Sequence, residues 1–388
     1  MINYENLFAQ KIQEIKKANL FRTIPEITAG AEKYITIEGK KCLNLASNNY
    51  LGLSLNEKLK TESIKAINKY GCSSSASRIV TGNYSLYTIL EEEIAKFKGY
   101  EKGLILGSGY VANLSIISAI CDNKWIVFSD RLNHASIIDG IKLSGAKHVR
   151  YKHNDMDHLR YSLKKYDKDV KKLIVTDTVF SMDGDTANLI EIVKLAKDYQ
   201  AIVMVDEAHA TGIFGKGRGL VHELGMEKEI DINMGTFSKG LGSFGAYVCA
   251  SKTIIEYLIN KSRGFIFSTS LPPSVIGANL AAIELLKNNY SLGLKLINIS
   301  EIVRKSLASL GFNTLNSSTQ IIPVIIGDRK KLFMAKDFLI KKGVFAAAIR
   351  PPSVPINTER LRISLRADLT DDELNLIIQA FKELSQCL

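Results

Sequence analysis

The sequence predicts an α/β protein in which a large, mostly parallel sheet domain is followed by a smaller C-terminal α+β domain. From about residue 56 to 285, apolar runs of strand length alternate with stretches of helical period, a pattern typical of an open α/β sheet. Beyond this region the elements follow one another as helix, strand, helix, strand, helix. We therefore expect an N-terminal helix and hairpin segment over 1–50, a large domain over 51–288 and a small domain over 289–388.

The N-terminal segment is predicted to begin with an amphipathic helix over 4–19, because its apolar residues recur at helical spacing. Two strand-like runs, 33–37 and 41–45, lie on either side of Glu38-Gly39, which indicates a hairpin.

In the large domain, apolar runs have the length and composition of buried strands. They are Gly103–Leu106, Trp125–Ser129, His148–Tyr151, Lys172–Thr176, Ala201–Val205, Ile230–Met234 and Ala246–Ala250. Helical stretches lie between most of them, so we expect the strands to run mostly parallel.

The large domain is predicted to close with a helix over 273–288, and the small domain to hold helices over 292–310, 330–342 and 370–386 and strands over 320–326 and 360–366. Thr370 and Glu373 form a capping box at the start of the last helix. Alternation along the last strand places Arg360, Arg362 and Arg366 on one face, where they either line solvent or bind a carboxylate.

Composition limits the classes of partner. The net charge of +11 raises the question of nucleic acid, but the lysines are spread along predicted helices without a basic stripe interleaved with aromatics. The cysteines are scattered and show no metal or disulfide spacing, which predicts a reducing cytosol. No secretory segment opens the chain and no apolar run is long enough to span a bilayer, so we expect no membrane partner.

The strongest chemical signal joins a strand end to a glycine-rich loop. The run Ala201–Val205 ends in Asp206 and His209, and charged groups at the carboxyl end of a parallel strand usually face a ligand. Lys239 lies in a loop bordered by glycines, where backbone can approach a bound group. A lysine that forms a Schiff base and an aspartate that keeps a pyridine nitrogen protonated suit pyridoxal 5′-phosphate (PLP). The alternative is a surface lysine near a buried aspartate.

Other polar groups also follow predicted strands. Gly109 and Tyr110 open a helix directly after a strand, where backbone N–H groups suit a phosphate, although a tight turn would look the same. His134 also follows a strand end, where a histidine is either a structural or a catalytic group. The histidines and aspartates within 153–158 lack metal-ligand spacing, so we interpret them as a solvated loop and expect no metal.

Seven motifs, in order and from about Leu20 to the C-terminus, resemble those of the α-oxoamine synthases. They are Asp206-Glu-Ala-His209, Thr236-Phe-Ser-Lys239-Gly, Phe180-Ser-Met-Asp-Gly-Asp185, Asp130-Arg-Leu-Asn-His134-Ala-Ser, Ser47-Asn-Asn-Tyr-Leu-Gly52, Ser268-Thr-Ser-Leu-Pro-Pro273 and Arg360-Leu-Arg362. The resemblance implies the aspartate-aminotransferase fold, known as fold type I of the PLP enzymes, and a homodimer with shared active sites.

The resemblance also implies roles at the cofactor. Lys239 would bond PLP as a Schiff base, Asp206 would pair with the pyridinium, and His134 would stack on the ring. Ser181 and His209 would hydrogen-bond the phenolic oxygen of PLP.

Further residues are implied around the phosphate and the substrates. Gly109, Tyr110 and Thr236 would hold the phosphate, with Thr269 contributed by a second subunit. Arg362 would bind the carboxylate of the amino acid, and Asn48 would lie near the reacting atoms. Arg22 and Arg350 are candidates for the distal end of the acyl chain or for the access channel.

The implied reaction is a decarboxylative condensation of an amino acid with an acyl thioester. The segment Ile349-Arg350-Pro-Pro-Ser-Val-Pro355 is similar to that of the biotin-pathway members, which join L-alanine to a pimeloyl group carried by CoA or acyl-carrier protein. Members that use glycine or serine with another acyl-CoA and an aminotransferase of the same fold remain as alternatives, and a non-catalytic nucleic-acid-binding protein ranks well below them.

Overall fold

The computed structural model describes residues 2–27, 30, 32–37 and 39–387. The chain divides into two compact units. The larger comprises Asn48–Ile299 and Arg366–Asp368, and the smaller comprises Met1–Ser47, Ser300–Leu365 and Leu369–Leu388. None of the helices in the described part has the length and apolar character needed to cross a membrane.

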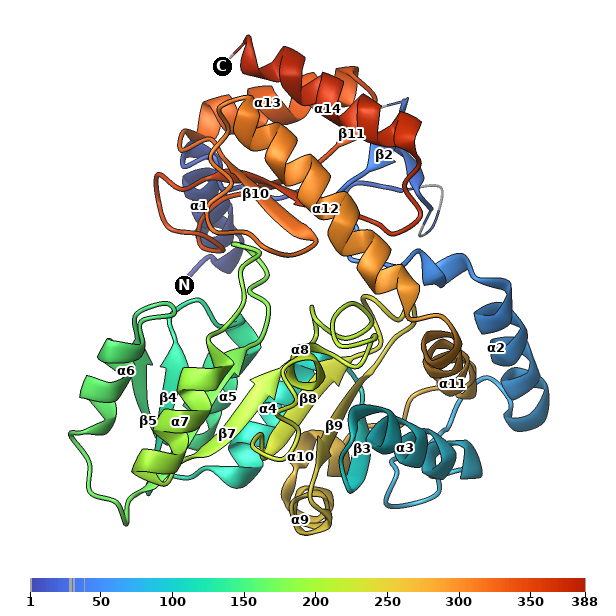
Figure 1. The fold of residues 1–388 in the computed structure, drawn as a ribbon, viewed down its shortest axis with the longest axis vertical. Helices are drawn as coiled ribbons and strands as arrows, with labels where there is room; N and C mark the ends of the chain where they lie inside the picture. The colour runs from blue at the N-terminus through green and yellow to red at the C-terminus, as the bar shows by residue number, and fades with distance from the viewer. Residues whose placement is uncertain (1, 28–29, 31, 38, 388) are drawn as a thin grey trace. The chain divides into compact units, whose positions relative to one another are not determined.

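A seven-stranded sheet of described residues forms the centre of the larger unit (Figure 1). In spatial order its strands are β3 (Lys102–Leu106), β9 (Ala246–Ala250), β8 (Ile232–Thr236), β7 (Ile202–Asp206), β6 (Lys171–Asp177), β4 (Trp125–Asp130) and β5 (Lys147–Tyr151). Strand β9 is antiparallel to both of its neighbours, and the other pairs are parallel. The predicted mostly parallel sheet is confirmed.

Helices surround this sheet and bury its apolar strands. They are α2 (Glu57–Tyr70), α3 (Ser85–Lys98), α4 (Gly109–Ile120), α5 (Ala135–Ser144), α6 (Met156–Leu163), α7 (Leu189–Tyr199), α8 (Leu220–Glu223), α9 (Lys252–Lys261), α10 (Arg263–Ile266) and α11 (Pro273–Asn288), with a 3-10 turn at Leu53–Leu55. Ile116 of α4, Ile141 of α5 and Leu258 of α9 pack in one core cluster with Val127 and Met234 of the sheet. This packing holds the strands in place within the sheet.

Three neighbouring strands end in an aspartate at the same edge of the sheet. Asp130 ends β4, Asp177 ends β6 and Asp206 ends β7. Because the three strands are parallel, their carboxyl ends meet, and Asp177 lies opposite Asp206 in the β6–β7 register. Such an edge is where open α/β sheets bind ligands.

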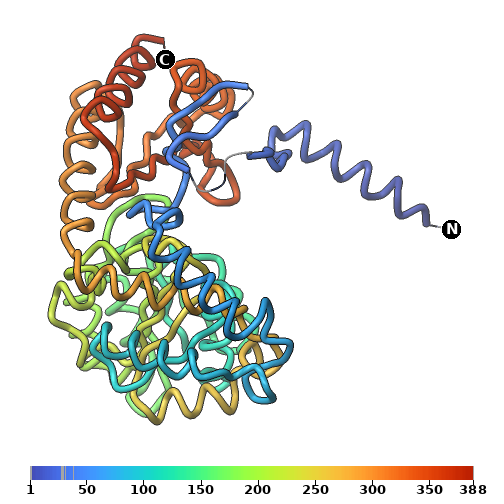
Figure 2. The backbone as a smooth tube through the Cα atoms, turned by 90° about the vertical axis from the view of Figure 1, so that its right-hand side faces the viewer, coloured from blue at the N-terminus to red at the C-terminus, as the bar shows by residue number. Residues whose placement is uncertain are grey.

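The smaller unit is built from the two ends of the chain. Its elements are α1 (Tyr4–Lys17), β1 (Tyr34–Ile37), β2 (Lys40–Asn44), β10 (Ile321–Ile325), α13 (Arg329–Lys341), β11 (Val344–Phe345), β12 (Ala347–Ile349), β13 (Arg360–Ser364) and α14 (Asp371–Ser385), and α12 (Ser291–Ser309) contributes to both units. Strand β2 pairs with β1 and also with the distant β11, so the first strands run beside C-terminal chain (Figure 2). The hairpin prediction holds for the strands, while Glu38 of its turn lies outside the described residues.

Two local predictions have clear outcomes here. The capping box of Thr370 and Glu373 is present at the start of α14. Arg360, Arg362 and Arg366 are 3%, 5% and 3% exposed, so the alternative that they line solvent is wrong.

Candidate active site

A cavity of about 240 Å³ lies at the carboxyl ends of the parallel strands in the larger unit. It brings together residues that the sequence places far apart, and seven of them are predicted site residues: Gly109, Tyr110, His134, Asp206, His209, Thr236 and Lys239. The cavity therefore has an anion-binding helix start, a carboxylate and a lysine in one space.

Lys239 lies in the loop between β8 and β9, whose glycines fit tightly against other backbone. A Cβ atom added at Gly240 would meet the carbonyl oxygen of Thr211 at 2.6 Å, and one added at Gly242 would meet the amide nitrogen of Ser54 at 2.6 Å. Gly242 also has a φ of +68°, which disfavours other residues. The glycines thus let the loop pack closely enough to hold the lysine at the cavity.

A line of hydrogen bonds leads away from this lysine. The Nζ atom of Lys239 lies 2.8 Å from Nε2 of His209, and Nδ1 of His209 lies 2.7 Å from the hydroxyl of Tyr50. The Tyr50 hydroxyl donates to Oδ1 of Asn48 at 3.0 Å. Tyr50 is fully buried, so its hydroxyl fixes the ring of His209 and, through it, the lysine.

Both carboxylate oxygens of Asp206 accept hydrogen bonds, which fix the side chain. The Nδ2 group of Asn113 donates to Oδ2 at 2.8 Å, and the backbone N–H of Ala208 donates to Oδ1 at 2.8 Å. Asp206 is only 5% exposed. A buried carboxylate with a fixed orientation can form a directed ion pair with one cationic group of a ligand.

Asp177, on the neighbouring strand, supports this arrangement. Its Oδ2 accepts the backbone N–H of His134 at 2.7 Å. Burial, and then the proximity of Asp206, raises the pKa of the Asp177 carboxyl well above its ordinary value. The direction of this shift follows because two adjacent buried carboxylates do not readily ionise together.

His134 is neutral and oriented by its neighbours. Burial lowers the pKa of its imidazole, and the nearby Asp206 does not offset that shift. Its Nδ1 lies 2.7 Å from Oγ of Ser136, which in turn accepts from Nδ2 of Asn113 at 2.9 Å. A neutral, fixed imidazole at the cavity wall is suited to stack on a flat aromatic ligand.

The opposite end of the cavity suits an anion. Helix α4 begins there at Gly109, which brings the positive end of its dipole to the cavity, while the N–H of Val111 is already paired with the N-cap Ser108 at 3.3 Å. A Cβ atom on Gly109 would lie 3.9 Å from Cβ of Thr236, so this helix start sits against the end of β8. The hydroxyls of Thr236 and Ser238 are 2.7 Å apart and line the same wall.

Three other predicted site residues of the larger unit are not among the described residues that line the cavity. Ser181 is half-buried and is not among the described residues that line the cavity. Thr269 is exposed and pairs with Ser77 in a short antiparallel bridge. Asn48 joins the site through Tyr50.

The arginines with predicted substrate roles belong to the smaller unit: Arg22, Arg350 and Arg362. Within that unit, Arg350 donates to the carbonyl oxygen of Phe21 at 2.8 Å. Arg362 donates to the hydroxyl of Ser364 at 2.7 Å.

The residues that our sequence analysis missed are Tyr50, Asn113 and Asp177. Tyr50 lies inside the motif Ser47-Asn-Asn-Tyr-Leu-Gly52, and Asp177 directly follows the predicted strand Lys172–Thr176, so their positions carried a signal. Asn113 is one turn into a helix whose other residues are mostly apolar, and a buried asparagine there is itself a sign of a polar partner.

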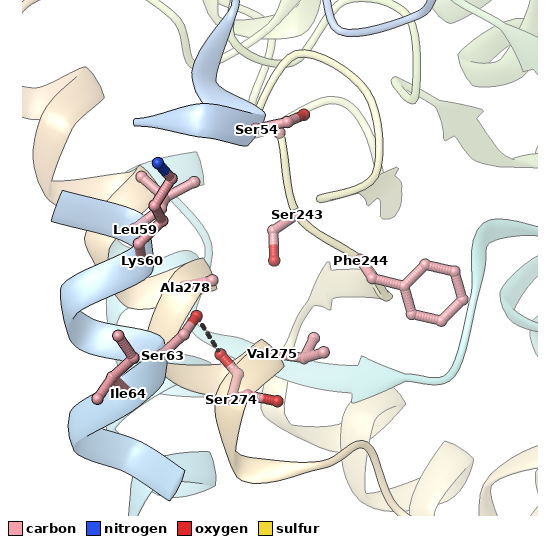
Figure 3. Close-up of a pocket in the computed structure, with 11 residues that line it drawn as sticks. Ser54, Leu59, Lys60, Ser63, Ile64, Ser243, Phe244, Ser274, Val275 and Ala278 are labelled. Carbon is pink, nitrogen blue, oxygen red and sulfur yellow. Dashed lines mark hydrogen bonds between the residues drawn. The ribbon is translucent and has the colours of Figure 1, made fainter. Parts of the chain in front are cut away.

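A second cavity, of about 490 Å³, lies beside the loop that follows Lys239 (Figure 3). Apolar and hydroxyl groups surround it, and Ser63 donates to the carbonyl oxygen of Ser274 across one wall at 2.9 Å. Lys60 is the one ionisable group among the described residues that line it. Because this larger cavity lacks an acid–base pair, the smaller cavity is the candidate active site.

The smaller cavity fits PLP. It offers Lys239 for covalent attachment, Asp206 for the pyridine nitrogen, a neutral His134 for the ring face and the start of α4 for the phosphate. The arrangement matches each charged end of the cofactor with a group of complementary charge.

Comparison with known proteins agrees with this chemistry. The aminotransferase class I and II family profile matches residues 40–381. Two proteins from different strains of Bacillus cereus, both named "Putative 8-amino-7-oxononanoate synthase", are similar to this chain over nearly its whole length. One is 47% identical over 378 residues, which are 97% of this chain and 96% of the relative. The other is 48% identical over 369 residues, which are 95% and 94%.

Solved structures similar to this chain belong to the same group of enzymes. The serine palmitoyltransferase of S. paucimobilis with bound PLP superposes with a TM-score of 0.92 at 30% identity, covering 99% of this chain and 98% of that one. The 8-amino-7-oxononanoate synthase of Francisella tularensis gives a TM-score of 0.77 at 28% identity, covering 88% and 97%. The chain therefore belongs to the aminotransferase class I and II family and, within it, to the α-oxoamine synthases, acyltransferases of fold type I whose cofactor is PLP.

Proposed function

We propose that this protein condenses L-alanine with a pimeloyl thioester to give 8-amino-7-oxononanoate, carbon dioxide and the free thiol carrier, a step of biotin biosynthesis. The observation that carries the proposal is the 46–48% identity, over nearly the whole chain, to relatives named for this reaction. The segment at Arg350 supports the same substrates.

The cavity residues account for the chemistry of the amino acid. PLP, when bound, supplies an electron sink for charge that develops at the Cα atom. Asp206 keeps the pyridine nitrogen protonated, and the amine of Lys239, once free and neutral, takes the Cα proton. His209 lies at hydrogen-bond distance from that amine, so it orients the base.

The arginines of the smaller unit account for the substrate carboxylates. We assign Arg362 to the carboxylate of alanine and Arg22 with Arg350 to the distal carboxylate of the pimeloyl group. Burial, followed by the positive charges of Arg22 and Arg329, lowers the pKa of Arg350. A cluster of cations that crowd one another is stabilised by an anion, which a dicarboxylic acyl group provides and a fatty acyl group does not.

We also propose a homodimer that shares its active sites. Thr269 is exposed, and large apolar side chains surround it: Ile79, Val80 and Phe267 are 53%, 73% and 71% exposed. An exposed apolar patch of this kind is typical of a protein–protein interface. In this arrangement Thr269 reaches the phosphate of PLP in the second subunit.

A serine-using synthase is the second candidate, because the structures with TM-scores of 0.92–0.93 are serine palmitoyltransferases. The test is thiol release from pimeloyl-CoA with L-alanine, compared with glycine and serine and with acetyl-, succinyl- and palmitoyl-CoA. Release that requires alanine and pimeloyl-CoA together supports the proposal. Faster release with serine and palmitoyl-CoA, or with glycine and a shorter acyl group, contradicts it.

The thiol carrier needs its own comparison. Pimeloyl-CoA and pimeloyl-acyl-carrier protein present the same pantetheine thioester, so both are assayed at equal concentration with alanine. Thiol release from neither carrier, while an added 2-oxo acid is converted to an amino acid, would instead identify an aminotransferase.

A further inference from the structure

His153 connects three neighbouring strand ends in the larger unit. It follows β5, and its Nδ1 lies 3.0 Å from Oδ1 of Asp130, the last residue of β4. Its Nε2 lies 2.8 Å from Oδ2 of Asp185, in the loop after β6. The side chain is 20% exposed, so our interpretation of this region as a solvated loop is wrong for His153.

The two contacts define the charge of the ring. An ionised carboxylate only accepts hydrogen bonds, so both ring nitrogens must donate, which an imidazolium does and a neutral imidazole does not. Burial alone lowers the pKa of His153, but the hydrogen bonds to Asp130 and Asp185 outweigh it and raise the pKa to about 10. His153 is therefore a cation between two carboxylates at neutral pH.

On one side, this cation supports the turn that carries His134. Oδ1 of Asp130 also accepts the backbone N–H of Leu132 at 2.8 Å. The next residue, Asn133, donates to a carbonyl oxygen of β6 at 2.7 Å, and the N–H of His134 donates to Asp177 at 2.7 Å. Hydrogen bonds therefore hold the turn at Leu132, Asn133 and His134.

On the other side, it supports the loop that carries Ser181. The N–H of Phe180 donates to the carbonyl oxygen of Asp185 at 3.0 Å, which closes the loop on itself. The Phe180 ring packs edge-on against the His153 ring with centroids 4.4 Å apart. Asn154 adds a donation from Nδ2 to Oδ2 of Asp185 at 3.0 Å. Ser181 is next to Phe180 and takes its place from these contacts.

We propose that His153 is a positioning residue that holds the turn bearing His134 and the loop bearing Ser181 at a fixed separation, and that this separation sets how tightly PLP binds. The inference rests on the proposed roles of His134 and Ser181 at the cofactor. It is independent of which amino acid and which acyl thioester the enzyme uses.

The test is His153→Gln, with His148→Gln on strand β5 as the matched control. His148 presents Nε2 without a hydrogen-bond partner among the described residues, so its replacement breaks no such bond at that atom. PLP is titrated into each apoprotein, and the absorbance of lysine-bound PLP is followed against pH. We expect His153→Gln to weaken PLP binding about tenfold, as loss of a charged hydrogen bond does, and to shift the pH midpoint of the absorbance change. The control should change neither.

A double variant, His153→Gln with Asp185→Asn, tests the connection itself. The Gln amide can donate to Asp130 while its oxygen accepts from the Asn amide, which restores the link between Asp130 and residue 185 without the imidazolium. The NH2 group of the Asn amide cannot at the same time accept from Asn154, so we expect the double variant to recover part of the PLP affinity, and it remains informative where the single variant does not fold.

The outcomes separate this inference from the proposed function. A His153→Gln protein that melts at lower temperature but keeps its PLP affinity and its pH midpoint overturns the inference, because a purely structural role predicts that result. A double variant that binds PLP as weakly as the single variant overturns it as well. Absence of thiol release by the wild-type enzyme overturns only the proposed function, since PLP titration involves no substrate.

Discussion

The Nζ atom of Lys239 lies 2.8 Å from the Nε2 atom of His209, and this contact fixes the direction of a longer line of hydrogen bonds. A lysine ammonium only donates, so Nε2 accepts and Nδ1 carries the imidazole proton. Nδ1 then donates to the hydroxyl of Tyr50, which donates to Asn48. These three contacts are all made when the His209 ring carries its proton on Nδ1.

Replacing Tyr50 by phenylalanine removes the middle of this line without changing the shape of the side chain. We expect kcat to fall about 10- to 100-fold, in the range of a misplaced acid–base group, with PLP still bound. Steady-state kinetics measure the loss, and Tyr161→Phe serves as the control because Tyr161 is 60% exposed. A Tyr50→Phe enzyme with wild-type kcat would show that His209 needs no such support.

Lys239→Ala tests the covalent lysine. Without its amine the protein can neither attach PLP nor take the Cα proton, so turnover should fall by more than about 10³-fold. Absorbance spectra should lose the band of lysine-bound PLP, while circular dichroism should show an unchanged fold. Ordinary thiol release by this variant contradicts the role given to Lys239.

Asp206→Asn tests the partner of the pyridine nitrogen. The amide keeps the size of the carboxylate and can still accept from Asn113 or Ala208, but it carries no charge to hold the nitrogen protonated. We expect kcat to fall about 10²-fold or more while the protein remains folded. If kcat changes less than twofold, Asp206 does not act on the electron sink.

Much of this site follows from the sequence because strand ends are visible in it. Asp206 terminates an apolar run, and Lys239 stands in a loop whose glycines are unusual in number, so both could be predicted without coordinates. The sheet could be predicted for the same reason, since buried parallel strands appear as short apolar runs. What placed His134 and Ser181 at a cofactor was resemblance to a known family.

The hydrogen bonds between side chains at the site could not be predicted. The contacts of Tyr50 with His209 and of Asn113 with Asp206 join positions 159 and 93 residues apart, and no periodicity encodes such a pairing. His153 shows the same limit, since a histidine beside several aspartates resembles a solvated loop until the fold brings Asp130 and Asp185 to its two nitrogens.

The pH dependence of stability follows from the charge of His153. Its pKa is about 10 in the folded protein and about 6.5 when unfolded, so the folded state holds an extra proton between these values. The stabilisation is complete below about pH 6.5 and is lost as pH rises toward 10. Urea midpoints measured at pH 6, 8 and 9.5 should fall more steeply for wild type than for His153→Gln. Parallel curves would contradict a raised pKa.

The buried pair of Lys98 and Glu207 gives a prediction about stability alone. Their side chains are 1% and 0% exposed, and Glu207 also accepts from the N–H of Val221 and from Asn233, both at 2.9 Å. Lys98→Met removes the cation and leaves this carboxylate buried without a counter-charge, which typically costs about 3–5 kcal/mol.

The control for Lys98→Met is Lys252→Met, which breaks a surface pair with Glu256 in which the side chains are 59% and 62% exposed. Solvent screens that pair, so we expect a loss within about 0.5 kcal/mol. Urea unfolding of both variants measures the contrast. Because Glu207 lies between Asp206 and His209 in the chain, Lys98→Met should also weaken PLP binding, while Lys252→Met should not. Equal losses of stability in the two variants would mean that solvent or another cation reaches Glu207 when Lys98 is absent.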